Sequence, residues 1–413
     1  MSYTKKEKYR FGKLFKYYRI RENVSVKDIE FFDRASYTTY RQAENGGMIR
    51  KDDFYDEFIQ FYHKEFKRIE NFDEWLNSYI PKAARAFEYF DEDYFAPLYK
   101  EMKEKLSDYK NCILYGEYYY LFKVLFQYYM ENHYLNKDEI DDLLELMKLD
   151  IFEHDLLACM VECLYTSNFN YVYDQQYGKK IIDATCFLRD EPLVRFYEAT
   201  ERESQCYFIQ SMKMYEDLYD RWKEESNHYR MAKCVNALYT LGCNIDDAFA
   251  EEKLIQLKEM IDTCKLPKNF MLNVSYNIAM ADMWAENYQE AFQRFMMIME
   301  QRKDEASLFF SCYCCDRMDH AYPLKLLESN PDNEYMKDLL EYYRMKANDY
   351  DEEQLVRHIM KVILPKKLIQ MKHMHPLWVI FDYELFNIAN KKTKYKKYYL
   401  NYHEKMTKNC KDA

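Results

Sequence analysis

Hydrophobic side chains recur at intervals of three and four residues along most of this chain, which is the period of an amphipathic helix. In residues 11–23, FGKLFKYYRIREN, Phe11, Leu14, Phe15 and Tyr18 form one such stripe, and Lys and Arg side chains flank it. Only six Gly and eight Pro occur in 413 residues, far fewer turn-forming residues than a sheet-rich fold needs. The pattern predicts an all-α protein.

Helix caps and stops divide the N-terminal part of the chain into short helices. Ser25 and Ser36 have the character of N-caps, which would open helices at residues 26–32 and 37–44. The segment Asn45-Gly46-Gly47 supplies a stop after the second of these helices. About four or five short helices are expected here, which is enough only for a compact bundle.

A further helix is expected to begin at Asp52 or Asp53 and to complete an N-terminal domain at residues 1–68. Residues 69–94 are predicted to be a linker helix region. We expect it to be interrupted near Pro81, because proline removes a helical hydrogen bond.

From residue 95 to residue 410, long amphipathic helices alternate with polar breaks at a spacing of roughly 35 to 45 residues, which is typical of stacked helix pairs. Breaks are predicted near Asn136, Pro192, Gly242, Pro267 and Asn348, among other positions. The pattern therefore predicts a repeat domain at residues 95–410.

One repeat, at residues 273–300, resembles a tetratricopeptide repeat in its turn and second helix. Glu286 begins the turn, the small residue Ala291 would let the two helices approach, and Phe295 would fill the gap to the next pair. The predicted fold is a helix-turn-helix bundle followed by a right-handed superhelical array of tetratricopeptide-like helix pairs.

Composition excludes several classes of protein. The twelve cysteines do not supply the two spaced ligand pairs that a zinc site needs, so neither a zinc site nor any other metal or cofactor is expected. Free thiols indicate the cytoplasm. No apolar run approaches the ~20 residues of a membrane span, and the N-terminus has no apolar core of a signal peptide. We expect a cytoplasmic protein that does not contact a membrane.

Charge is unevenly distributed along the chain. A net charge of −11 argues against a protein that coats nucleic acid indiscriminately. Residues 1–28 nevertheless carry nine basic and three acidic side chains. A local anion-binding surface and a simple solvated terminus both fit this pattern. The basic residues are Lys5, Lys6, Lys8, Arg10, Lys13, Lys16, Arg19, Arg21 and Lys27.

Residues 24–47 have the layout of a helix-turn-helix, with a short helix, a tight turn and a recognition helix. The segment resembles the repressor-type helix-turn-helix family at Ser25, Ile29, Ala35, Ser36, Thr39, Glu44 and Gly46. Gly12, Lys13, Leu14, Phe15 and Arg19 resemble its first helix. The resemblance implies a partly buried ion pair between Arg19 and Glu44.

The candidate DNA-binding residues are Lys13, Ser36, Tyr37, Thr38 and Arg41. The chain departs from the family pattern at Val26, Glu30 and Arg34, where a polar residue, a small residue and a glycine are usual. These departures leave two interpretations open. The bundle either reads DNA or only docks against the array.

A repressor-type head followed by a degenerate repeat array resembles the peptide-pheromone receptors of Gram-positive bacteria, the Rgg/PlcR/PrgX type. The opening FGKLFKYYR is similar to the Rgg branch. The resemblance implies a homodimer that binds double-stranded promoter DNA and holds a short signalling peptide in the concave groove of the array.

Peptide-binding candidates follow from this resemblance and from amide chemistry. An Asn side chain can both donate to and accept from an extended peptide backbone, and Asn is a poor helix-interior residue without a partner. Asn236, Asn273 and Asn277 fall on expected first helices of repeats, and Tyr239 and Tyr276 are candidates for apolar walls. An ordinary hydrogen bond between helices is the alternative for each amide.

Two other function classes compete with a regulator. The first is a tetratricopeptide-like interaction protein with a degenerate head that does not bind DNA. The second is an enzyme, but the chain has no Gly-rich phosphate loop, nucleophile elbow or HExxH motif. Phosphatase activity like that of some Rap proteins has no local motif to support it, so the chain is not expected to be an enzyme.

Overall fold

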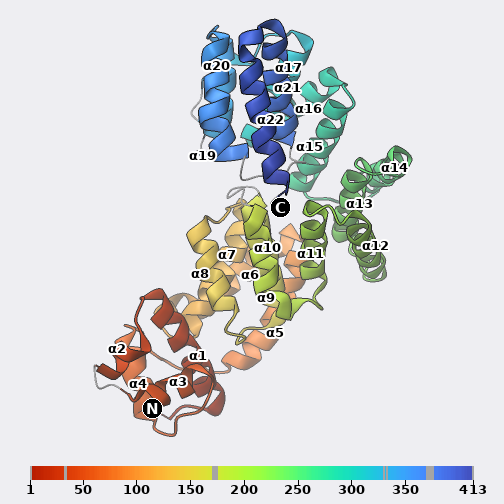
Figure 1. Ribbon diagram of the computed structural model, residues 1–413. Coiled ribbons are helices and arrows are strands. Elements are labelled where there is room, and N and C mark those ends of the chain that lie inside the picture. The colour runs from red at the N-terminus through yellow and green to blue at the C-terminus, as the bar shows by residue number, and fades with distance from the viewer. Residues whose placement is uncertain are drawn as a thin grey trace. The chain divides into compact units, whose positions relative to one another are not determined.

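The computed structural model describes residues 2–31, 35–169, 175–328, 331, 334–368 and 376–411. Within these ranges the chain is all-helical, with one isolated bridge between Glu65 and Cys112 and no strand (Figure 1). The all-α class predicted from the sequence is therefore confirmed for the part of the chain that is described.

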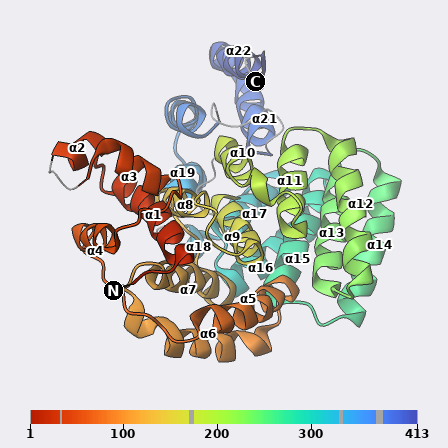
Figure 2. The ribbon, with the colours of Figure 1, turned by 90° about the horizontal axis from the view of Figure 1, so that it is seen from below.

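The helices group into two compact units. The first unit comprises the described residues of 1–172, 176–242 and 248–260, and the second those of 173–175, 243–247 and 261–413. Helices α1–α4 lie together at one end of the first unit (Figure 2). The predicted domain boundaries at residues 68 and 94 stay predictions.

The helices that lie mainly in the first unit are α1 (Lys5–Arg21), α2 (Val26–Phe31), α3 (Tyr37–Glu44), α4 (Asp52–Phe61), α5 (Phe72–Tyr89), α6 (Glu92–Leu106), α7 (Tyr115–Glu131), α8 (Lys137–Met147), α9 (His154–Ser167), α10 (Gln175–Ala184), α11 (Pro192–Ser204), α12 (Phe208–Glu224), α13 (His228–Gly242) and α14 (Asp247–Thr263). The second unit contains α15 (Lys268–Trp284), α16 (Tyr288–Arg302), α17 (Glu305–Met318), α18 (Leu324–Leu327), α19 (Glu334–Ala347), α20 (Glu352–His358), η4 (Ile359–Leu368), α21 (Pro376–Lys391) and α22 (Lys396–Lys411).

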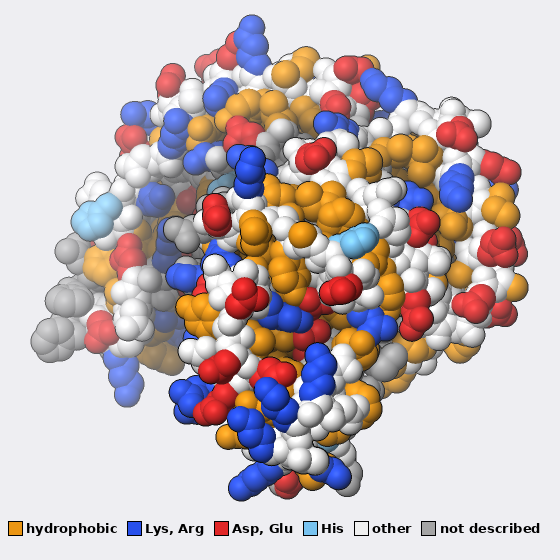
Figure 3. Space-filling view, turned by 90° about the horizontal axis from the view of Figure 1, so that it is seen from above, with side chains coloured by type: hydrophobic (Ala, Val, Ile, Leu, Met, Phe, Trp, Pro, Cys, Tyr) orange, Lys and Arg blue, Asp and Glu red, His pale blue; other side chains and the backbone are white. Residues whose placement is uncertain are grey.

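The surface mixes charges of both signs. On the face shown in Figure 3, Lys and Arg side chains are interspersed with Asp and Glu, and exposed hydrophobic side chains lie between them. Among the helices described, none has both the length and the apolar character that crossing a membrane requires.

Helices α2 and α3 begin where the sequence predicts their caps. Ser25 Oγ accepts a hydrogen bond from Asp28 N at 3.1 Å, and Ser36 Oγ accepts one from Thr39 N at 3.3 Å. After α3 the chain turns at Gly46, whose φ of +85° is the left-handed conformation that favours glycine. The two N-caps and the helix stop predicted from the sequence are confirmed.

Helices α1 and α3 cross in close contact at Gly12. A Cβ atom at Gly12 would lie 2.2 Å from the carbonyl oxygen of Ala43, so any larger residue would push the helices apart. Buried aromatic rings of Phe15, Tyr55 and Phe58 fill the space beside this crossing, and the rings of Phe15 and Phe58 lie 5.6 Å apart.

A second face of α1 packs against the helices that follow the N-terminal bundle. Tyr17 donates to Asp142 of α8 at 3.0 Å, and the buried Tyr18 donates to Glu117 of α7 at 2.6 Å. Burial raises the pKa of Tyr18 well above its usual value, so the phenol remains a donor. The bundle of α1–α4 is therefore joined to the rest of the first unit by buried side chains.

Helix α5 is continuous where the sequence predicts an interruption of the linker region. Pro81 lies inside α5 and the helix continues on both sides of it, so the predicted interruption is wrong. Tyr79, Ile80 and Ala83 are buried around the proline. Their packing outweighs the missing hydrogen bond, which costs about 3 kcal/mol in a helix interior.

The predicted breaks near Asn136, Pro192, Gly242, Pro267 and Asn348 are confirmed, because a helix begins or ends at or beside each of them. In the first unit the resulting helices α11, α12 and α13 pack side by side in sequence order (Figures 1 and 2).

A buried ion pair joins three helices of the first unit. The Arg230 guanidinium of α13 donates to both carboxylate oxygens of Glu162 in α9, at 2.9 and 2.6 Å. The same guanidinium donates to the backbone carbonyls of Glu88 at 2.6 Å and Phe87 at 3.2 Å, in the last turn of α5. Helices α5, α9 and α13 therefore share one buried contact.

Three more side chains complete this network, which we call the Glu162 cluster: Glu162, Arg230, Lys233, Tyr129 and Tyr197. Tyr129, Tyr197 and Lys233 all donate to Glu162, at 2.7, 3.0 and 2.8 Å. Burial alone would raise the pKa of Glu162, but Arg230 and Lys233 hold it far below its usual value. The carboxylate is therefore charged at neutral pH.

The second unit begins with the helix pair α15 and α16. Ala291 and Phe295 of α16 are completely buried. The Phe295 ring contacts Tyr276 of α15 at 5.8 Å and stacks on Phe310 of α17 at 5.6 Å. Phe295 thus fills the gap to the next helix, as the sequence predicts.

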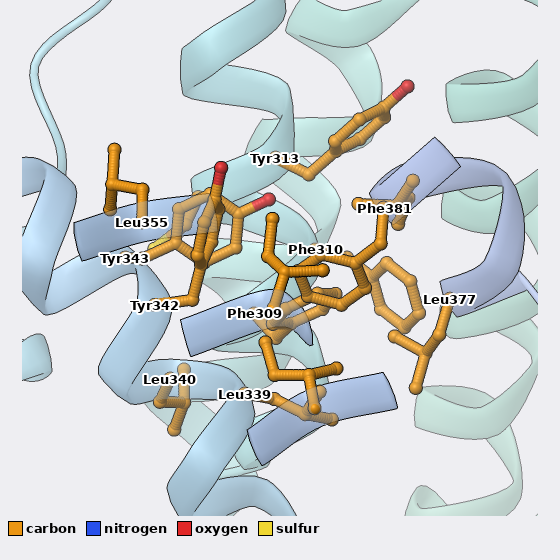
Figure 4. Close-up of a cluster of buried hydrophobic side chains, with 14 of the residues drawn as sticks. Phe309, Phe310, Tyr313, Leu339, Leu340, Tyr342, Tyr343, Leu355, Leu377 and Phe381 are labelled. Atoms are coloured by element: carbon orange, nitrogen blue, oxygen red, sulfur yellow. The ribbon is translucent and has the colours of Figure 1, made fainter. Parts of the chain in front are cut away.

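The core of the second unit is largely aromatic. Figure 4 shows Phe309 and Phe310 of α17 among Tyr342 and Tyr343 of α19 and Phe381 of α21. The rings of Phe309 and Tyr343 lie 5.2 Å apart, and those of Tyr342 and Phe381 lie 5.4 Å apart. Such ring pairs add about 0.5–1.5 kcal/mol each beyond the area that they bury.

Glu162→Gln should destabilise the first unit by about 3–5 kcal/mol, because Arg230 would lose its charged partner in a buried position. The matched control Glu198→Gln removes only the half-exposed pair with Arg202 and should cost less than about 1 kcal/mol. Urea unfolding of the full chain at neutral pH measures both.

The pH dependence provides a second check on the same variant. Because the pKa of Glu162 is lowered in the folded protein, its contribution is present above the unfolded pKa and is lost as the pH falls. The two proteins should therefore converge in stability in acid. Equal unfolding midpoints for the variant and the wild type at neutral pH would contradict the role given to this cluster.

Candidate functional site

Helix α3 presents a short polar face to solvent. The side chains of Ser36, Thr38 and Gln42 are exposed, and Tyr37 is 43% exposed. The opposite face of the helix carries the completely buried Tyr40. This division follows from the helical period, which places one face of α3 toward solvent and the opposite face against the bundle core.

Ser36 shapes the start of α3. Besides capping Thr39 N, its hydroxyl lies 2.8 Å from the Thr39 hydroxyl. These two contacts engage the Ser36 side chain locally, although the residue is exposed. Ser36 therefore positions Tyr37 and Thr38 at the helix N-terminus.

Glu44 anchors the end of α3. Its carboxylate is fully buried, and Arg19 Nε of α1 lies 2.6 Å from Glu44 Oε1. Arg19 also donates to the carbonyl oxygen of Val24 at 3.1 Å. One guanidinium thus connects α1 to both α3 and the segment that precedes α2.

Arg41 is a second partner of Glu44. Arg41 Nη1 lies 3.1 Å from Glu44 Oε2, while 42% of the Arg41 side chain remains exposed. The hydrogen bond and the charge of Glu44 raise the pKa of Arg41. The spacing of three residues between Arg41 and Glu44 was a signal for this contact, and sequence reasoning missed it.

Acidic side chains neutralise much of the basic N-terminus. Within the described residues Lys6, Lys8, Arg10, Arg19 and Arg21 each form an ion pair with a carboxylate. Lys5, Lys13, Lys16 and Lys27 have no such pair there. The Lys13 ammonium lies 5.7 Å above the ring of Tyr9, which also covers Gly46.

The structure describes only part of the turn between α2 and α3. Arg34 lies outside the described residues, so the structure gives no conformation for it. Val26, the first residue of α2, is 9% exposed and contributes to the core of the bundle. An apolar residue at this position thus serves packing.

The candidate peptide-binding residues divide between the two units. Asn236 and Tyr239 lie on α13 in the first unit, where Asn236 is half-buried and Tyr239 is 4% exposed. Asn236 lies one turn after Lys233 of the Glu162 cluster. Sequence reasoning did not single out Lys233, because the carboxylate that it contacts lies 71 residues away in the chain.

In the second unit, Asn273, Tyr276 and Asn277 lie on α15. Asn273 is exposed, and its amide oxygen accepts a hydrogen bond from Arg302 of α16 at 2.5 Å. Asn277 is half-buried. Tyr276 packs against Phe295 and Phe310, so most of its ring belongs to the core of the unit.

No group of three or more His, Cys, Asp or Glu side chains that could hold a metal ion occurs among the described residues. The thiols of Cys312, Cys314 and Cys315 are buried in α17, and burial raises the pKa of each. In comparisons with known proteins, no protein-family model matches the chain, and neither does any curated protein.

Arg19→Ala should destabilise the protein by about 1–3 kcal/mol, because buried Glu44 would lose its closest cation. Arg41 still pairs with Glu44 in this variant, which limits the loss of stability. The full chain is the right sample, since a fragment ending near residue 70 would lose the contacts of α1 with α7 and α8.

The control for this experiment is Arg21→Ala, which removes a more exposed pair with Asp142 and should cost less than about 1 kcal/mol. Chemical denaturation compares the two variants with the wild type. An Arg19→Ala midpoint no lower than that of Arg21→Ala would contradict the anchoring role of Glu44.

Proposed function

We propose that this protein is a cytoplasmic, homodimeric transcription regulator that binds double-stranded promoter DNA through α2 and α3. A short signalling peptide held by the helix pairs that follow the N-terminal bundle would control its activity. The helix pairs are proposed to continue as a right-handed superhelical array, and no catalytic activity is proposed.

The observation that carries the proposal is the exposed N-terminal face of α3, which bears Tyr37, Thr38 and Arg41. A recognition helix needs this combination, because its N-terminal side chains contact base edges while its opposite face is fixed. Here the Gly12 crossing and the Arg19–Glu44 pair fix the opposite face. Lys13, which has no carboxylate partner among the described residues, would contact phosphate.

Support for peptide control comes from the amides of α13 and α15. Asn236 and Asn277 are half-buried on α13 and α15. An amide in such a place can pair with a peptide backbone in both directions. The coupling to DNA would arise from a peptide that prefers one arrangement of the dimer.

A second candidate is a protein-interaction module whose N-terminal bundle does not read DNA. Its support is the ion pair of Arg41 with buried Glu44, because contact with a base edge would compete with that pair. The ion pairs of the basic N-terminus favour it as well.

Substitution of Arg41 and Lys13 tests DNA binding. The probe is a duplex that the full-length protein selects from a random-sequence pool. Arg41→Ala should weaken binding to this duplex by about 1–3 kcal/mol while affinity for unrelated duplexes changes little. Lys13→Ala should weaken binding to all duplexes and reduce the slope against salt concentration by about one.

Electrophoretic retardation at several salt concentrations provides the measurement. The control is Lys148→Ala at the exposed residue that follows α8, which should leave the retardation unchanged. If the protein selects no duplex, or if both variants bind like the wild type, the second candidate function is correct. The protein is then a protein-interaction module whose N-terminal bundle does not read DNA.

Asn277→Ala tests peptide control. The probe is a peptide selected by the full chain from a displayed random-heptapeptide library. A hydrogen bond left unmade costs about 1–3 kcal/mol, so the affinity measured by fluorescence anisotropy should fall by about one to two orders of magnitude. The control Asn273→Ala should have a smaller effect, because Asn273 is exposed and water can replace a hydrogen bond that it loses. Unchanged affinity in Asn277→Ala would place the peptide elsewhere.

A further inference from the structure

A cavity of about 330 Å³ opens between α5, α9, α11 and α12 of the first unit. Ala84, Ala158 and Leu193 form an apolar part of its lining, which we call the apolar floor, and the last two are buried. A volume of this size lies at the small end of ligand pockets, which span about 300–1,000 Å³. The cavity can therefore hold one short apolar stem with a polar end.

The polar groups around the cavity are mostly carboxylates. Asp155 lies in the first turn of α9, and Glu191 occupies the N-cap position of α11. Neither of them forms an ion pair with a Lys, Arg or His among the described residues. Burial and the neighbouring charge of Asp155 both raise the pKa of Glu191, and His154 and Arg221 offset this only in part.

Two arginines, Arg221 and Arg85, also line the cavity. Arg221 lies 3.3 Å from Glu225, with which it forms an ion pair. The Arg85 guanidinium lies 5.1 Å above the ring of Tyr89. The lining carries four carboxylates, those of Glu88, Asp155, Glu191 and Glu225, against these two arginines, so negative charge is in excess beside the apolar floor.

We propose that this cavity binds a monovalent organic cation, an alkylguanidinium or alkylammonium group whose short stem lies on the apolar floor. The head group lies between the carboxylates of Asp155 and Glu191, where it relieves the repulsion between them. A planar guanidinium fits two carboxylates better than a point charge does, because it offers several donors in a fixed fork. The proposal goes beyond the function proposed above and does not depend on DNA binding.

Such a ligand would contact Glu88, whose backbone is hydrogen-bonded to Arg230 of the Glu162 cluster. Glu88 lines the cavity, its side chain accepts a hydrogen bond from Trp222 at 3.0 Å, and its backbone carbonyl accepts one from Arg230. A bound cation therefore stabilises the junction of α5 with α12 and α13. Binding should raise the unfolding midpoint of the full chain.

Charge selectivity is the first test. Butylguanidinium, the isosteric but neutral N-butylurea and the anion pentanoate are titrated into the full chain and followed by ligand-detected NMR at low ionic strength. Butylguanidinium should bind about fivefold to tenfold more tightly than N-butylurea and weaken as salt is added. Equal affinity for the two, tighter binding of pentanoate, or no binding at tens of millimolar would overturn the proposal.

Variants locate the binding within the cavity. Glu191→Gln should lower the affinity for butylguanidinium about fivefold, and Ala84→Leu should abolish binding by filling the floor. Glu198→Gln, which lies on the same helix but does not line the cavity, should bind like the wild type. Urea midpoints check that each variant is folded, and wild-type affinity in Glu191→Gln overturns the assignment.

Two peptides distinguish a free small cation from an arginine side chain. Acetyl-Leu-Arg-Leu-amide is compared with the same peptide carrying citrulline, which is neutral and isosteric. A preference for arginine, with binding at least tenfold tighter than that of butylguanidinium, identifies the ligand as a side chain of a peptide. No gain over butylguanidinium identifies a free small cation, whereas equal binding of both peptides contradicts the proposed site.

Discussion

The ion pair between Arg230 and Glu162 constrains how three helices of the first unit pack together. A guanidinium taken out of water is costly unless each of its donors finds an acceptor. Arg230 finds them only when α5 offers the carbonyls of Phe87 and Glu88 and α9 offers Glu162. The three helices can therefore approach in one arrangement, and the apolar packing between them fills in around it.

The second unit also contains a partly buried cluster of charged side chains, but in it the carboxylates outnumber the cations. Lys346 lies between Asp316 and Glu384, so two carboxylates share one ammonium. Tyr342 donates to Glu384 at 2.5 Å and supplies part of the missing compensation. Burial and the charge of Glu384 raise the pKa of Asp316, which is the expected response of an acid whose neighbour is also an acid.

Local signals in the sequence predicted local structure well. The caps at Ser25 and Ser36 and the glycine stop at Gly46 act within one helical turn, so they can be recognised without knowing the fold. The period of three to four residues likewise predicts which side of α3 is exposed. Pro81 shows the limit of local rules, because packing from distant helices keeps α5 continuous around it.

Contacts between distant segments could not be predicted in this way. The partner of Arg230 lies 68 residues away, and that of Asn273 lies on the following helix. The Asn side chains of α13 and α15 were recognisable as unusual helix residues, but their surroundings depend on how each helix pair packs. The Arg41–Glu44 contact differs, because its spacing of three residues is a local signal, although Glu44 is also held by Arg19 from another helix.

Helix α1 decides how the proposed DNA-binding helix responds to the rest of the first unit. One face of α1 crosses α3 at Gly12 without room for a Cβ atom, and the other donates from Tyr17 and Tyr18 to α8 and α7. Because α1 is one continuous helix of 17 residues, it links these two sets of contacts through a single element. A change in the packing of α7 or α8 would therefore reorient α3 directly, whereas a flexible linker would absorb it. A ligand that prefers one such packing would bias the orientation of α3 by its difference in affinity and by no more than that.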